Sequence, residues 1–109
     1  MLRKLGMSRK KFKVVISQYV YDSILAVYRG ICHESLSGAD HVRRALISGM
    51  ESLRDFPERY PRYETEGLRD RQLRKMVILK RYLVFYEVVG EEVRIYHVVD
   101  GKRDYAHLL

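Results

Sequence analysis

The chain has 109 residues, 47% of them hydrophobic and 32% charged, and carries a formal net charge of +7. This length predicts one domain with one modest core, and this composition excludes a disordered chain. A single cysteine, Cys32, excludes an internal disulfide and suits the reducing cytoplasm, while no apolar run approaches the ~20 residues of a membrane span.

The positive charge is concentrated in two segments of the chain. Residues 1–13 contain lysines and arginines but no acid, and residues 69–81 contain basic residues with Asp70 as the one acid. A cationic protein attracts an acidic partner, which can be nucleic acid, a membrane surface or an acidic protein. We interpret residues 1–11 as a basic tail without the apolar stretch of a secretory signal, and residues 12–109 as a single domain.

The first half of the domain predicts one strand and two helices. Residues 12–17, "FKVVIS", are rich in β-branched side chains, which is typical of a strand. Val20, Ile24 and Ile31 then recur at helical spacing and predict a first helix with one apolar face.

A second helix is expected to begin near Ser37, because Asp40 follows three residues later as in a capping box. Pro57 ends this helix near Asp55. The two helices therefore predict an antiparallel hairpin. The apolar stripe of the second helix consists of Val42, Leu46, Met50 and Leu53.

The second half of the domain predicts three strands, at residues 73–79, 81–89 and 92–100. Gly90 can supply the positive φ that a tight turn requires, so the last two strands form a hairpin. The order β-α-α-β-β-β predicts an α+β fold in which the helical hairpin packs on a small twisted antiparallel sheet.

Three segments in this order resemble the RelE/ParE superfamily of bacterial toxins from type II toxin–antitoxin systems. The segments are "SLRDFPERYPRY", "LRKMVILKRYLVFYEV" and "VRIYHVVDGKRDY". The resemblance covers roughly residues 12–109 and implies the same fold. It also implies a cognate antitoxin as partner and leaves a homodimer open.

The superfamily has two main branches, and the residues favour one of them. The RelE-like branch cleaves messenger RNA in the ribosome, whereas the ParE-like branch poisons DNA gyrase. Nuclease members carry an arginine in the middle strand, and the matching residue here is Leu83; a second basic position of that branch matches Met76. An apolar Leu83 cannot stabilise a pentavalent phosphate, so the sequence favours the ParE-like branch and a protein that is not an enzyme.

Several residues are candidates for a functional site. If the chain is a ribonuclease, the resemblance and the chemistry of proton transfer and phosphate binding select Arg103, Arg74, His97 and Lys75. As a binding protein it would use exposed cations and an aromatic ring at the end of the sheet, and we expect these to be Arg74, Lys80, Arg81, Arg94, Lys102, Arg103 and Tyr105. The structural alternatives are a packed strand histidine at His97 and a surface ion pair between Arg103 and Asp104.

We expect neither a metal nor a cofactor, because the cysteine and histidines lack the spacing of a zinc site. The favoured hypothesis is a ParE-like toxin that inhibits growth through DNA gyrase and is neutralised by an antitoxin. One alternative is a ribosome-dependent endoribonuclease that acts on messenger RNA. The other is a degenerate member that only binds its antitoxin or nucleic acid.

Overall fold

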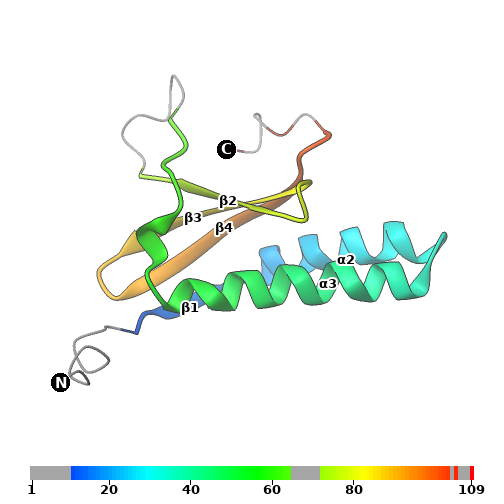
Figure 1. The fold of residues 1–109 in the computed structure, drawn as a ribbon, viewed down its shortest axis with the longest axis horizontal. Helices are drawn as coiled ribbons and strands as arrows, with labels where there is room; N and C mark the ends of the chain where they lie inside the picture. Colours follow the sequence, from blue (N-terminus) through cyan, green and yellow to red (C-terminus); the bar gives the residue numbers. More distant parts are fainter. Residues whose placement is uncertain (1–10, 65–71, 104, 106–108) are drawn as a thin grey trace.

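A four-stranded sheet with two helices on one side forms the domain (Figure 1), as seen in a computed structural model that describes residues 11–64, 72–103, 105 and 109. The predicted α+β fold and its order of elements are confirmed. The predicted tail lies outside these residues except for Lys11. The elements are β1 (Lys13–Ile16), α2 (Gln18–Cys32), α3 (Leu36–Glu51), η1 (Ser52–Arg54), η2 (Pro57–Arg59), β2 (Arg74–Ile78), β3 (Tyr82–Val89) and β4 (Glu92–Asp100).

The strand order is β1-β4-β3-β2, so the first and last strands of the chain are neighbours. The pairs β2–β3 and β3–β4 are antiparallel, as the tight turns predict. However, β1 pairs with β4 in parallel, with Val14 opposite Val93, so the sheet is mixed and not wholly antiparallel as expected. A strand that is reached through two helices has no tight turn to impose antiparallel pairing.

Both helices begin at serine caps. The Ser17 hydroxyl accepts a hydrogen bond from the Val20 amide, and the Ser35 hydroxyl accepts one from the Gly38 amide at 2.9 Å. These bonds satisfy amides that have no partner inside the helix. The sequence placed the start of the second helix near Ser37, two residues after the observed N-cap at Ser35.

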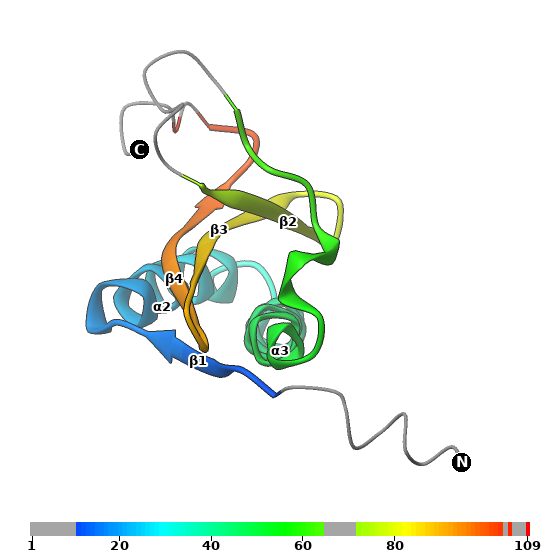
Figure 2. The ribbon, with the colours of Figure 1, turned by 90° about the vertical axis from the view of Figure 1, so that its left-hand side faces the viewer.

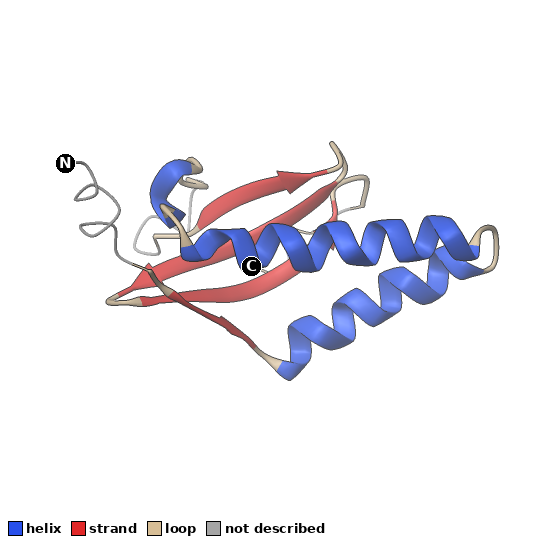
Figure 3. Cartoon of the chain, turned by 60° about the horizontal axis from the view of Figure 1, so that its bottom comes forward, coloured by secondary structure: helices blue, strands red, loops and turns tan. Residues whose placement is uncertain are grey.

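The main core lies between the helices and the sheet (Figure 2), and the helices contribute the apolar stripes predicted from their periodicity. The two helices lie closest at their connecting turn and diverge toward β1 (Figure 3). The fully buried residues of this core include Val20, Leu46, Met50, Leu53, Val84, Tyr86 and Val93.

The turn between β2 and β3 places two successive non-glycine residues in the left-handed region, Leu79 at φ 56° and Lys80 at φ 58°. The Arg81 amide closes the turn by donating to the Ile78 carbonyl at 3.1 Å. Positive φ at both central residues is the pattern of a type I′ turn, which favours asparagine and glycine.

Replacing the central pair by Leu79→Asn and Lys80→Gly is expected to raise the free energy of unfolding by about 1–2 kcal/mol, since it removes left-handed strain. Leu79 is 44% exposed, so little apolar burial is lost. Thermal unfolding checks this, with Leu36→Ala at a distant exposed site as control. An unchanged melting temperature would contradict it.

Candidate functional site

The pairing of Tyr82 with Asp100 brings the β2–β3 turn to the end of β4. We call residues 80–81 and 100–103 the C-terminal lip. The Arg81 guanidinium donates to both carboxylate oxygens of Asp100, at 3.1 and 2.8 Å, and its carbonyl accepts from the Gly101 amide at 2.7 Å. These bonds fix the lip to the sheet.

The charges of the lip fall into two groups. Arg81 and Asp100 neutralise each other, and the hydrogen bonds from Arg81 hold the pKa of the Asp100 carboxyl below its usual value. The side chain of Arg103 is 83% exposed, with its Nε 3.9 Å from Asp100, and Lys102 is exposed beside it. The lip therefore presents Lys80, Lys102 and Arg103 as exposed cations on a scaffold held by the Arg81–Asp100 pair.

The lowered pKa of Asp100 predicts a dependence of stability on pH. A carboxyl with a lower pKa in the folded state stabilises the protein above its unfolded pKa, and this contribution is lost as the pH falls through the folded pKa. The advantage in melting temperature of the wild type over Asp100→Asn is expected to be constant above about pH 5 and to shrink below about pH 4. A constant difference across that range would show that Arg81 does not stabilise the ionised carboxyl.

A groove of about 600 Å³ runs between α2 and the last part of β4. The strand β1 pairs with β4 only as far as Ile95, so the remainder of that edge faces the helix. Ala26 and Gly30 give the helix side of the groove a small-residue surface, and Arg103 and Tyr105 line its other side. The groove thus adjoins the C-terminal lip.

The predicted site residues Arg74 and Lys75 point to opposite faces of the sheet. Arg74 pairs with Tyr86, whose ring lies in the core beneath the helices, and its guanidinium donates to the carbonyls of Glu58 and Tyr60 at 3.2 and 2.7 Å. Arg74 therefore holds a loop and does not join the C-terminal lip, contrary to the expected gathering of cations. The Nζ atom of Lys75 lies 5.6 Å from the ring centre of Tyr63 on the outer face.

The outer face of the sheet, opposite the helices, is apolar at its centre. Leu83, Phe85 and Val99 form a buried cluster there, covered in part by Tyr63 and Tyr105. The ring centres of the two tyrosines lie 4.9 and 5.6 Å from that of Phe85. The position that carries an arginine in nuclease members is thus packed among hydrophobic side chains, and Leu83 is 8% exposed.

The four ribonuclease candidates are not brought together. Lys75 and His97 both pair with Phe85 and so flank it on the outer face. The His97 ring also meets Tyr19 of α2 edge-on at 5.8 Å. Arg74 lies on the helix side and Arg103 lies beyond the end of β4. Within the described residues, these four side chains do not surround one phosphate-sized position.

Of the predicted binding residues, the structure gathers Lys80, Arg81, Lys102 and Arg103 at the C-terminal lip. Arg94 lies in the first half of β4, where its Nε donates to Glu92 at 2.9 Å. It belongs to a separate part of the surface, because five residues of β4 lie between Arg94 and the lip.

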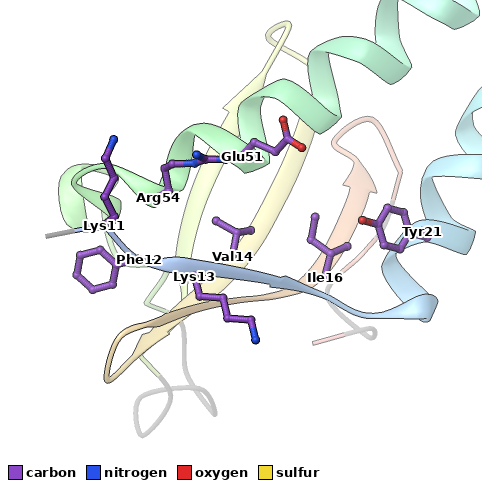
Figure 4. A pocket seen from close by; sticks show the side chains of 8 residues that line it. All are labelled: Lys11, Phe12, Lys13, Val14, Ile16, Tyr21, Glu51 and Arg54. Carbon is purple, nitrogen blue, oxygen red and sulfur yellow. The ribbon is translucent and has the colours of Figure 1, made fainter.

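The helical hairpin opens onto a second groove that was not anticipated from the sequence (Figure 4). We call it the hairpin-end groove. Val14 and Ile16 of β1 line its apolar floor, and Tyr21 of α2 stands at one end. Its volume is about 560 Å³. The charged residues around it are Lys11, Lys13, Glu51 and Arg54.

Residues 52–60, which we call the Phe-Pro loop, are held by hydrogen bonds from Arg59 within the loop and from Tyr86 of β3. The Arg59 guanidinium donates to the carbonyls of Ser52, Asp55 and Phe56. The buried Tyr86 hydroxyl donates to the Pro57 carbonyl, and burial raises the pKa of this phenol to about 12. Sequence reasoning identified this segment as part of a family motif but missed its bonding network.

Comparison with known proteins identifies the family of this fold. The model of the family described as "ParE toxin of type II toxin-antitoxin system, parDE" matches residues 14–105. The chain belongs to the ParE toxin family. The predicted resemblance and the preference for the ParE-like branch are thereby confirmed.

A solved structure supports the fold of this ParE-family chain. It is described as "Chromosomal ParDE TA system from P. aeruginosa", with a TM-score of 0.67 and 13% sequence identity. The match covers 83% of this chain and 96% of the other. No curated protein matches the sequence. The family implies an antitoxin as partner of this toxin.

Among the described residues of this ParE toxin, no helix is long and apolar enough to span a bilayer. Within those same residues, no group of three or more histidine, cysteine, aspartate or glutamate side chains is arranged to hold a metal ion.

Proposed function

We propose that this ParE-type toxin arrests growth by inhibiting DNA gyrase in the cytoplasm, and that an antitoxin neutralises it by direct binding. The observation that carries the proposal is the apolar centre of the outer face, where Leu83 replaces the arginine of nuclease members. A buried leucine provides no positive charge for a phosphate in the transition state, so inhibition by protein contact fits this face better than RNA cleavage.

The C-terminal lip supplies contacts of the kind an acidic target would recognise. Lys102 and Arg103 are exposed, whereas the charge of Arg81 is largely balanced by Asp100. Exposed cations at a rim increase the rate of association more than the final affinity. We therefore assign Lys102 and Arg103 to steering and contact with the target.

The hairpin-end groove fits a segment of the antitoxin. Its floor of Val14 and Ile16 can take apolar side chains. Of the charged residues that line it, Lys13 and Arg54 outnumber the one acid, Glu51, while Lys11 is paired with Asp55 at 3.0 Å. An acidic amphipathic segment would bury apolar surface there while its carboxylates face the cations. In this proposal, neutralisation takes place at the opposite end of the sheet from the C-terminal lip.

Inducible expression of the chain alone, followed by two parallel assays, tests the proposed function. Purified protein should inhibit supercoiling by gyrase, and primer extension on translated messages should show no new 5′ ends. Lys102→Glu with Arg103→Glu should weaken inhibition, while Arg43→Glu on α3 serves as a charge control. Cleaved messages without gyrase inhibition would instead support the ribonuclease alternative, in which Lys75 and His97 beside Phe85 are the first residues to replace.

A further inference from the structure

The Phe-Pro loop displays an aromatic ring on a strained backbone. Phe56 has φ 51° and ψ 58°, in the left-handed region that residues with a side chain rarely adopt. It also precedes Pro57, which favours extended conformations in the residue before it. Nevertheless the phenyl side chain is not used to fill the core, because Phe56 is 60% exposed. This combination is costly and requires a reason.

Side chains of the loop itself and of the sheet hold this strained conformation. The Arg59 guanidinium donates to the Phe56 carbonyl at 3.2 Å and to the Ser52 hydroxyl at 3.0 Å. The Tyr86 hydroxyl donates to the carbonyl of the next residue, Pro57, and Arg74 donates to the carbonyl of Glu58. Strain that is maintained by several independent contacts is characteristic of functional positions.

The surroundings of the ring are cationic on balance. Residues 54–62, "RDFPERYPR", contain three arginines against one aspartate and one glutamate. Arg54 and Arg62 are exposed, while Asp55 is engaged by Lys11 at 3.0 Å. A partner that meets this surface should therefore be acidic around the point where it receives the ring.

We propose that Phe56 is an anchor residue that inserts into an apolar socket, rimmed by acidic groups, on a folded protein. A ring fixed by its backbone loses little conformational entropy on binding, which is the property of an aromatic hot spot. A protruding ring needs a preformed socket, which a folded protein has and an extended segment lacks. The inference rests on the proposed function, in which the folded partner is DNA gyrase and the antitoxin segment occupies the hairpin-end groove.

Two variants separate the ring from the backbone that carries it. Phe56→Ala and Phe56→Gly both remove the ring, but only glycine adopts the left-handed conformation without strain. Both should raise the concentration for half-inhibition of supercoiling by gyrase holoenzyme about 30-fold, as for a truncated aromatic hot spot. The melting temperature of Phe56→Gly should nonetheless lie about 4–8 °C above that of Phe56→Ala. Leu36→Ala, at a residue 61% exposed, is the matched control and should leave inhibition unchanged.

Binding of the cognate antitoxin gives the second readout. Phe56→Ala and Phe56→Gly should bind it with the wild-type dissociation constant. Inhibition of gyrase by Phe56→Ala at the wild-type concentration would overturn the inference. So would loss of antitoxin binding with inhibition retained, because the ring would then serve the antitoxin. If the wild type itself does not inhibit gyrase, the proposed function fails and the inference fails with it, a result distinct from a defect confined to the Phe56 variants.

Discussion

Replacing Tyr86 by alanine is expected to lower the free energy of unfolding by about 3–5 kcal/mol, the cost of deleting a large aromatic side chain from a core. Tyr86 is fully buried beneath the helices, and its hydroxyl donates to the Pro57 carbonyl. The substitution thus leaves a cavity and also releases one bond of the Phe-Pro loop. The free energy of unfolding of a domain of this size is about 5–15 kcal/mol in total, so the variant should be close to unfolding. Urea unfolding measures the change.

Tyr86→Phe is the matched control for the hydrogen bond. It keeps the ring and leaves the Pro57 carbonyl without its donor, which should cost about 1–3 kcal/mol. If Tyr86→Phe lowered the free energy of unfolding as much as Tyr86→Ala, the packing of the ring would contribute little. A cost for alanine below about 1 kcal/mol would contradict the position of Tyr86 in the core.

The second large effect is expected at Gly101, where the chain leaves β4. A Cβ atom at this position would lie 2.6 Å from the carbonyl oxygen of Arg81, a backbone atom that cannot move aside as a side chain can. That carbonyl also accepts a hydrogen bond from the Gly101 amide, with an N···O distance of 2.7 Å. Gly101→Ala should therefore separate the lip from the sheet and lower the free energy of unfolding by about 1–3 kcal/mol, as measured by thermal unfolding.

Gly30→Ala is the control for this glycine substitution. A Cβ at Gly30 meets no atom within 4 Å, and the residue lies inside α2. Alanine should raise the free energy of unfolding there by about 0.5–1 kcal/mol, through its higher helix propensity. If both substitutions changed the free energy of unfolding in the same direction, the close approach of the Arg81 carbonyl would not be the reason for glycine at Gly101.

Local sequence patterns were sufficient for most of the fold. The three strands of the second half have strong β-branched and aromatic content, and Gly90 adopts φ 62° in the turn that was predicted for it. The parallel pairing of β1 with β4 was missed because it joins the two ends of the chain, and periodicity within a segment carries no information about distant partners. The start of α3 was missed because two serines, Ser35 and Ser37, both qualify as caps.

The functional surfaces were less predictable than the fold. The lip cations could be placed together, because Arg81 and Arg103 flank strands that were recognised as neighbours. The role of Arg74 was not predictable, since the carbonyls it binds belong to residues sixteen and fourteen positions earlier in the chain. A phenylalanine before a proline in a polar segment was the one available signal for Phe56, and only the backbone geometry shows why it matters.

The parallel register of β1 with β4, in which Lys13 lies opposite Glu92, bears on how the toxin is made. A ribosome releases β1 and the two helices first. The strand β4, with which β1 pairs and against which α2 packs, is among the last parts of the chain to emerge. Until then the nascent chain has a helical pair with an open apolar stripe and no finished sheet. Toxicity should therefore begin only when translation is nearly complete, and prematurely terminated products should be degraded by proteases and should not be toxic.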